Sequence, residues 1–486
     1  MHCAIDAYHA LDTDDPKLAE AAAALATRSA DELFSRLLKS HSDGWSPGLL
    51  QVKEVRLQVE FRQLSPNLQP PLRIMRARDV PMDAFSGDRR ARAGFGVPLA
   101  ALSPRAIEMP LGRLVPHSGM FRNLTAWIEP DAQESGAPPH LVLADPQKTD
   151  AIAIGAHRLT LASDSSAAYA WAMRISKLER SGLWGLLGGH KIGRRAGLYL
   201  LEDYDPDKRP LVMIHGLGSN PLIWSHLSNA VWSAEDLRAR FQIWQVIHQT
   251  DAPLLVARMR VQDYLDDAWR MLDPAGEASA RAGVVLVGHS LGGVVARLLC
   301  ADSGEALWNA AFLVPPQSLV ASSEDREELQ RIFSFHPYPG IARAVFLAAP
   351  HRGSPGAETA LGRLTRDLVG RRAIEVHALR RIAQANPEAV RPEMLRIFQK
   401  GWINSITTLQ SELPVRRAAE SLLPSTGIPY HTIAGVLPGR RQQTDGFVPL
   451  ASTLIPGAAS CLVVESGHGV YKNPHAVAEI LRILRQ

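Results

Sequence analysis

Short apolar runs alternate with helical patterns from residue 197 onward, and this alternation constrains the fold more than any other feature of the chain. The runs are Gly197–Glu202, Leu211–Ile214, Phe241–Ile247, Val284–Val287, Ala344–Ala348, His431–Ala434 and Leu462–Val464. Helical patterns such as 257–272 and 291–300 lie between them. Runs that are apolar throughout are typical of strands buried on both faces. The alternation therefore predicts an α/β domain with a mostly parallel sheet and helices on both faces.

In the N-terminal part of the chain, apolar residues recur at different spacings. Residues 15–40 have the pattern of an Ala-rich amphipathic helix, which we expect to break near Ser29. Residues 55–61 alternate between apolar and polar side chains, which is typical of a half-buried strand. Further strands are predicted at Gly94–Leu102, Phe121–Ile128, His140–Ala144 and Ala151–Leu161. We interpret this region as a small β-rich accessory domain, with a sandwich as its expected arrangement.

These changes of period divide the chain into three predicted parts. They are an N-terminal helical segment at 1–45, the β-rich domain at 46–196 and the α/β domain at 197–486. Two connections within the last part, at about 301–341 and 351–429, are too long for simple loops. Helical patterns at 359–384 and 392–409 lie in the second one. Long insertions on an α/β scaffold usually have a function, so we expect them to form a helical cap.

Composition and charge exclude several classes of protein. The 486 residues include 53 Lys and Arg against 49 Asp and Glu, so the formal net charge is only +4 and no nucleic-acid partner is expected. Three widely spaced cysteines form neither a disulfide framework nor a metal knuckle. Zinc-ligand spacing, an EF-hand loop and a GxGxxG turn are missing from the sequence, so we expect no metal and no cofactor.

The lengths of the apolar runs in the sequence indicate where the protein is expected to be located. No apolar run reaches the ~18 residues of a spanning helix, and the first fifteen residues have no signal-peptide pattern. The sequence as given therefore favours the cytoplasm. A start site further upstream would allow export or membrane association.

The pentapeptide Gly288–Gly292 matches the pattern GxSxG with Ser290 at its centre. The match alone is weak, but a predicted strand precedes it and a predicted helix follows it. In a strand-to-helix turn this tight the central serine is strained and exposed at the carboxyl edge of the sheet, where it can act as a nucleophile. The alternative is a glycine-rich packing turn with an incidental serine.

The sequence His215-Gly216-Leu217-Gly218 follows another predicted strand. Glycines allow such a turn to present backbone N–H groups to a developing negative charge. We assign the expected oxyanion hole to the N–H groups of Leu217 and Leu291, the residue after the nucleophile. His215 is expected to be a structural hydrogen-bonding residue, and an ordinary βα loop is the alternative for the whole turn.

A serine nucleophile needs a base, and the base in turn needs an orienting acid. His468 lies between two glycines after the last predicted strand, at the edge that Ser290 should reach, so we predict that it is the base. Asp445 precedes a glycine after the strand before that one, and it is the predicted acid. The competing bases are His351, His431 and His475. The competing acid is Glu465, and Asp445 could instead serve a plain turn.

Five motifs stand in the order typical of one family. They are HGLGSNP (215–221), GHSLGG (288–293), APHRGSP (349–355), TDGFVP (444–449) and SGHGVYKNP (466–474). Over residues 200–486 the chain resembles bacterial lipase- and esterase-like α/β-hydrolases, including members with an extra N-terminal domain. The resemblance implies the α/β-hydrolase fold and a Ser–Asp–His acyl hydrolase. Such relatives tend to be exported or membrane-associated, whereas this sequence has no visible signal.

We therefore expect an enzyme that cleaves carboxylic esters, with a small-molecule or lipid ester as substrate and contact with a lipid surface as a further expectation. Alternatives are an acyltransferase, thioesterase, amidase or peptidase with the same triad, or a non-catalytic interaction protein on a hydrolase scaffold. Apolar residues in the first insertion either line an acyl pocket or form the core of a helix pair. They are Trp308, Phe312, Leu313, Val314, Phe333 and Phe335.

Overall fold

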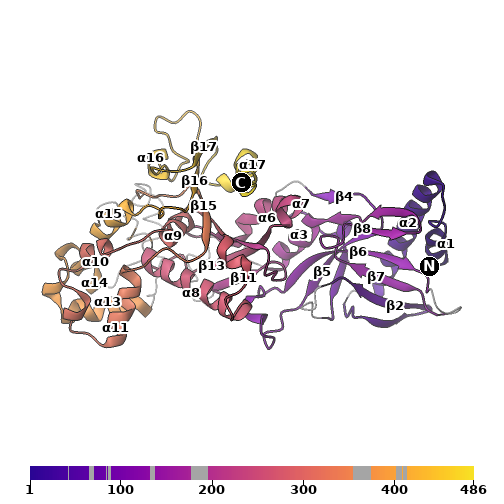
Figure 1. The fold of residues 1–486 in the computed structure, drawn as a ribbon, viewed down its shortest axis with the longest axis horizontal. Coiled ribbons are helices and arrows are strands. Elements are labelled where there is room, and N and C mark those ends of the chain that lie inside the picture. Colours follow the sequence, from indigo (N-terminus) through magenta and orange to yellow (C-terminus); the bar gives the residue numbers. More distant parts are fainter. Residues whose placement is uncertain are drawn as a thin grey trace. The chain divides into compact units, whose positions relative to one another are not determined.

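The computed structural model describes residues 1–41, 43–64, 70–83, 85, 89–131, 137–176, 195–353, 374–400, 405, 408 and 413–486. The chain divides into two compact units, whose elements are labelled in Figure 1. Unit 1 comprises Met1–Lys177, Leu201–Asp203 and Ser228–Glu235. Unit 2 comprises Leu178–Leu200, Tyr204–Leu227 and Asp236–Gln486. The three-part division of the sequence stays a prediction.

Unit 1 contains a six-stranded mixed sheet with the strand order β1-β2-β7-β6-β5-β3. The strands are β1 (Gly48–Val52), β2 (Val55–Arg62), β3 (Arg73–Arg76), β5 (Val97–Ser103), β6 (Met120–Glu129) and β7 (His140–Ala144). Only β2 and β7 pair in parallel. The β-rich region is thereby confirmed.

The sandwich interpretation of this region is wrong, because helices pack against the sheet instead of a second large sheet. Phe34 and Leu37 of helix α2 (Pro16–Ser40) share one buried cluster with Leu57 of β2 and Leu124 of β6. Helix α3 (Ser165–Ser176), which the sequence analysis did not predict, packs against β5 and β6. The apolar face of the sheet is thus buried by helices.

Helix α2 is continuous, so the expected break near Ser29 is wrong. Its alanines repeat every three or four residues and give a narrow face that lies close to its neighbours, at Ala19, Ala22, Ala26 and Ala30. Asp15 caps the first turn by accepting a hydrogen bond from the N–H of Lys17 at 2.9 Å. Packing along this face outweighs the small helix penalty of a serine.

One predicted strand of unit 1 is a hairpin. Residues 151–161 form β8 (Ala151–Ile154) and β9 (His157–Thr160), which pair with each other. Gly155 turns the chain between them with a φ of +55°. A positive φ favours glycine. In the sequence, the alternation of residues on both sides of Gly155 resembled one continuous strand and gave no sign of the turn.

Unit 2 is built on a seven-stranded sheet with the order β11-β13-β12-β14-β15-β16-β17. The strands are β11 (Gly197–Leu200), β12 (Arg209–Ile214), β13 (Phe241–Ile247), β14 (Val284–His289), β15 (Ile341–Leu347), β16 (Tyr430–Val436) and β17 (Ser460–Glu465). All neighbours pair in parallel except β11 and β13. Each predicted strand overlaps an observed one, so the α/β architecture is confirmed.

Two helices between these strands also match the prediction, namely α8 (Leu254–Leu272) and α9 (Leu291–Leu299). Helix α17 (Pro474–Leu484) follows the last strand. Helix α9 packs against β14 and β15, α8 against β11, and α17 against β17. Because β12 to β17 are parallel, their carboxyl ends lie at one edge of the sheet, and the loops that follow them can share a site.

The described residues of the two long connections form helices that Figure 1 shows grouped beyond α8 and α9. They are α10 (Ala306–Ala311), α11 (Ser323–Phe333), α13 (Ile374–Ala385), α14 (Pro392–Lys400) and α15 (Pro414–Ser421). Helix α10 packs against α15, and α13 packs against α14 and α11. The parts of the helical patterns predicted at 359–373, 401–404, 406–407 and 409 lie outside the described residues.

The aromatic residues of the first connection form a core between these helices. The ring centroids of Trp308 and Phe312 are 4.4 Å apart, and those of Phe312 and Phe333 are 5.5 Å apart. Leu313, by contrast, is 54% exposed. Trp308 and Phe312 therefore serve the helix core, whereas Phe333 also lines a pocket described below.

Candidate active site

Ser290 occupies a strained turn between β14 and α9. Its φ is +54°, a region that side chains other than glycine rarely adopt. Glycines make the turn sterically feasible, since a Cβ on Gly288 would lie 2.4 Å from the carbonyl oxygen of Gly292. A Cβ on Gly292 would in turn lie 2.2 Å from the carbonyl oxygen of Ile214. The turn thus has the predicted strand-to-helix geometry and strain, whereas the expected exposure of the serine is wrong, because Ser290 is only 9% exposed.

The structure brings Ser290, His468 and Asp445 into one chain of hydrogen bonds. The distance from Nε2 of His468 to Oγ of Ser290 is 2.9 Å, and that from Nδ1 of His468 to Oδ2 of Asp445 is 2.7 Å. Because the carboxylate accepts, Nδ1 carries the proton and donates it. The lone pair of Nε2 then faces the serine hydroxyl, which is the tautomer that a general base needs.

Asp445 is held as a carboxylate by its surroundings. It is only 3% exposed, and Oδ1 accepts hydrogen bonds from the N–H groups of Phe447 at 2.8 Å and Val448 at 2.7 Å. Burial raises the pKa of Asp445, but the hydrogen bond and charge of His468 and these two N–H groups lower it further, so the net shift is downward.

None of the competing histidines makes a described hydrogen bond to Ser290 or Asp445. His351 is buried with its ring against Phe346. Nδ1 of His431 lies 2.8 Å from Oγ of Ser460. His475 lies in the first turn of α17, where its backbone N–H donates to Asn473.

The competing acid is not the partner of the histidine either. Glu465 is exposed at the end of β17, and its described hydrogen bond goes from Nδ2 of Asn473 to its backbone carbonyl. His468 pairs instead with Asp445, whose Oδ2 faces the ring.

The expected oxyanion residues flank the serine. A Cβ on Gly216 would lie 2.7 Å from Cβ of Ser290, so the loop that carries Leu217 passes directly beside the hydroxyl. Leu291 is the first residue of α9, where the backbone N–H has no partner within the helix. Both positions suit donors to a developing oxyanion, while their role stays a prediction.

Sequence reasoning missed His248 and Thr250, which hold this loop. Nε2 of His248 donates to the carbonyl oxygen of His215 at 2.9 Å, and the N–H of His248 donates to Nε2 of His215 at 3.4 Å. Oγ1 of Thr250 accepts from the N–H of Gly218 at 3.3 Å. Both residues follow β13 at the edge where β12 also ends, and only the pairing of these two strands brings them to the loop.

His215 has the structural role that we expected. Its Nδ1 donates to the carbonyl oxygen of Gly216 at 3.1 Å, since Nε2 must accept from His248. Burial lowers the pKa of His215 well below its usual value and also lowers that of His248. The stacked pair, with ring centroids 4.6 Å apart, is therefore neutral.

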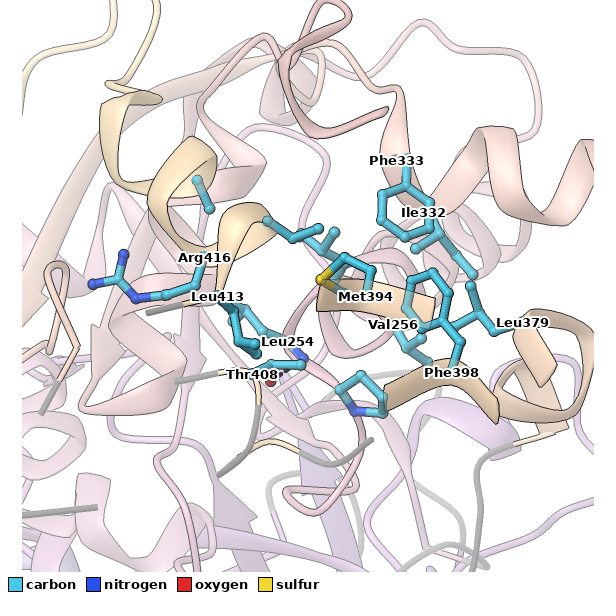
Figure 2. Close-up of a pocket in the computed structure, with 14 residues that line it drawn as sticks. Leu254, Val256, Ile332, Phe333, Leu379, Met394, Phe398, Thr408, Leu413 and Arg416 are labelled. Atoms are coloured by element: carbon cyan, nitrogen blue, oxygen red, sulfur yellow. Dashed lines mark hydrogen bonds between the residues drawn. The ribbon is translucent and has the colours of Figure 1, made fainter. Parts of the chain in front are cut away.

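An apolar pocket lies among the helices of the two long connections and the start of α8 (Figure 2). The space between its lining residues, together with the open solvent at its mouth, amounts to about 520 Å³. Its lining is almost entirely apolar, with Thr408 and Arg416 as the polar members. The lining residues are Pro253, Leu254, Leu255, Val256, Ile332, Phe333, Leu379, Met394, Phe398, Thr408, Leu413, Val415, Arg416 and Ala419.

The strand directions relate this pocket to the site. The wall formed by Pro253 and Leu254 begins a few residues after β13 ends. Strands β13, β12 and β14 are parallel, so that wall and Ser290 belong to the same edge of the sheet. In Figure 2, Phe333 of α11 and Met394 and Phe398 of α14 line the space.

In the described part of the chain, no three or more His, Cys, Asp or Glu side chains are grouped so that they could hold a metal ion. None of its helices combines the length and the apolar character that crossing a bilayer requires.

Comparison with known proteins gives one family and several distant structures. Residues 211–480 match the family model described as "Alpha/beta hydrolase family". A mature lipase from Bacillus licheniformis is 15% identical over 58% of this chain and 94% of its own, with a TM-score of 0.34. An esterase from Rhodococcus sp. ECU1013 is 14% identical over 60% of this chain and 94% of its own, with a TM-score of 0.29. No curated protein matches the chain.

Proposed function

Because the chain belongs to the alpha/beta hydrolase family, we propose that it is a serine hydrolase that cleaves carboxylic esters through an acyl-enzyme on Ser290. One observation carries the proposal, namely the hydrogen bonds from Asp445 through His468 to Oγ of Ser290, at 2.7 and 2.9 Å. A serine on a strained turn beside a correctly protonated imidazole has the geometry of an activated nucleophile.

The proposed reaction has two steps. In the first, Oγ of Ser290 attacks the ester carbonyl carbon while Nε2 of His468 takes the hydroxyl proton. The tetrahedral oxyanion accepts hydrogen bonds from the N–H groups of Leu217 and Leu291. The C–O bond to the alcohol then breaks, and His468 gives its proton to the leaving oxygen. In the second step His468 activates a water, which cleaves the acyl-enzyme and releases the acid.

Asp445 supports both steps through its charge. The carboxylate fixes the proton on Nδ1 of His468 and stabilises the imidazolium that forms in each transition state. Its downward pKa shift keeps it ionised at neutral pH. Its burial also keeps water from screening the interaction with the imidazolium.

The pocket supports esters with an apolar acyl part. Burial of a hydrocarbon chain is favourable by about 0.8 kcal/mol per CH₂, and the lining offers almost no competing polar group. We extend the proposal to acyl chains of several carbons, including those of lipid esters. Acyl transfer to an alcohol or release from a thioester uses the same serine chemistry, so product analysis must separate these reactions.

The test is steady-state hydrolysis of p-nitrophenyl esters that differ in acyl length. Ser290→Ala should lower kcat by about 10⁵–10⁶-fold, because only binding and the oxyanion donors remain. The wild type should prefer an acyl chain of medium length over acetate. A folded Ser290→Ala protein that keeps more than about a tenth of wild-type activity would rule out this assignment.

A further inference from the structure

His289 lies directly before the nucleophile and takes no part in the mechanism above. It is 5% exposed, and its Nε2 lies 2.8 Å from the backbone carbonyl oxygen of His468. The centroid of its ring is 4.9 Å from that of His468 and 4.9 Å from that of Tyr471. His289 therefore joins the strand that delivers the serine to the loop that delivers the base.

The other side of the ring faces the oxyanion loop. A Cβ on Gly216 would lie 3.2 Å from Nδ1 of His289, so the backbone of that loop packs against the imidazole. One side chain thus contacts the base loop and the oxyanion loop while it is covalently attached to the residue before Ser290. No other described histidine has this position.

The proton positions follow from the contacts. A carbonyl oxygen only accepts, so Nε2 of His289 must donate, and Nδ1 carries a lone pair without a partner among the described residues. Burial, followed by the charge of His468, lowers the pKa of His289 to about 3. The imidazole is therefore neutral at the pH where the site works, and it adds no like charge beside the imidazolium that forms at His468.

Glycines lie on both sides of His468 in its loop. The backbone of glycine has more conformational freedom than that of other residues, and a Cβ on Gly469 would meet nothing within 4 Å. The loop is held at its ends, where the N–H of Ser466 donates to the last residue of β16 and Val470 is fully buried. The hydrogen bond from His289 acts between these ends, on the carbonyl of the catalytic histidine itself, so it is well placed to restrict the imidazole.

We propose that His289 is a positioning residue, whose hydrogen bond to the carbonyl oxygen of His468 keeps the catalytic imidazole within reach of Ser290 and Asp445. The inference rests on the proposed serine hydrolase function. Misplacement of a catalytic group by about 1 Å costs on the order of 100-fold in rate. Loss of the bond should therefore act on kcat and leave substrate binding almost unchanged.

The experiment compares two substitutions at this position in the full-length chain. His289→Phe keeps an aromatic ring but has no donor, whereas the amide of His289→Gln reaches as far as Nε2 and restores an N–H. We expect His289→Phe to lower kcat by about 10–100-fold with KM within twofold, and His289→Gln to recover most of the loss. His431→Phe is the matched control, because it removes another buried histidine of the same sheet that contacts Ser460 instead of the site.

Two results would overturn the proposal. The first is a folded His289→Phe protein with wild-type kcat, and the second is a Gln variant as slow as the Phe variant. If the Phe variant does not fold, which thermal unfolding will show, the flexible apolar His289→Met takes its place in the same comparison.

Failure of the proposed function gives a different pattern. If the wild type cleaves no ester, that proposal fails while the positioning role remains testable, because a fluorophosphonate reacts with a histidine-activated serine without any ester. The labelling rate of Ser290 should then fall in His289→Phe and recover in His289→Gln. Equal labelling rates in all three proteins would contradict the positioning role.

Discussion

At the scale of single residues, the proposed mechanism assigns a separate task to each of three side chains. In it, Ser290 supplies the nucleophile, His468 moves the proton, and Asp445 fixes which ring nitrogen is free to accept it. The task of Asp445 depends on its negative charge and on the direction of its hydrogen bond with His468. A substitution that keeps the shape of the side chain but removes the charge therefore abolishes this task.

Asp445→Asn should lower kcat by about 10⁴-fold, because an amide can donate to the ring and stabilise the wrong tautomer. The measurement is steady-state hydrolysis of a p-nitrophenyl ester near neutral pH. Glu465→Gln is the control, since Glu465 is exposed and makes no described contact with His468. A reversed order of effects, with the Glu465 variant slow and the Asp445 variant fast, would move the acid to Glu465.

Much of this arrangement was predictable from residues alone. Ser290, His468 and Asp445 each follow a predicted strand, and parallel strands bring such positions to one edge. His248 was not predicted, because its function comes from the pairing of β13 with β12, and no local pattern encodes which strands are neighbours. Leu217 and Leu291 are expected to act through their backbone N–H groups. The identity of their side chains therefore gives no information about these roles.

At the scale of elements, the turn between β14 and α9 is the most tightly packed feature of the site. Gly292 sits against the backbone of β12, and backbone atoms cannot move aside as a flexible side chain can. The position of the serine therefore depends on a glycine that makes no chemical contribution.

Gly292→Ala should destabilise the protein by about 1–3 kcal/mol or displace Ser290, because its Cβ would lie 2.2 Å from the carbonyl oxygen of Ile214. Thermal unfolding and esterase activity measure the two effects. Gly469→Ala is the matched control, with no atom within 4 Å of the new Cβ. Equal stability and activity in both variants would show that the turn is looser than described.

Phe312→Ala tests the assignment of the aromatic residues to the helix core. The side chain is 2% exposed and packs on Trp308, so truncation should cost about 3–5 kcal/mol of stability. The neighbouring Leu313→Ala is the control, because Leu313 is 54% exposed. If Phe312→Ala keeps full stability but changes acyl-length preference, Phe312 belongs to the substrate pocket.

The sequence predicted elements well where burial on both faces left a clear pattern, as in β13. It failed where tertiary packing decided the outcome. Residues 151–161 alternate as one strand would, yet Gly155 folds them into a hairpin. The apolar face of the sheet in unit 1 did not reveal whether helices or another sheet would cover it.

At the scale of the whole molecule, buried histidines couple stability to pH. Five of the described histidines of unit 2 are buried and have lowered pKa values, namely His215, His248, His289, His351 and His431. For each, the unfolded chain binds a proton that the folded protein excludes. Their contribution to stability is complete above the unfolded pKa of about 6.5 and is lost as pH falls toward the folded values.

His431 allows a direct measurement of this linkage. Burial, followed by the charges of Arg343 and Arg482, lowers its pKa to about 4. Between pH 6 and pH 4.5 it should contribute a slope of about 1 kcal/mol per pH unit to the free energy of unfolding. Urea unfolding of His431→Gln should show a shallower pH dependence than the wild type. An unchanged slope would show that His431 is as easily protonated in the fold as outside it.

The central claim is that Ser290, activated by His468, is the nucleophile of this protein. Fluorophosphonate labelling followed by peptide mass spectrometry tests it most directly. We predict one adduct per chain on Ser290, no adduct at this position in Ser290→Ala, and labelling of His468→Ala slower by several orders of magnitude. A folded wild-type protein that stays unlabelled, or that carries its adduct on another residue, would contradict the claim.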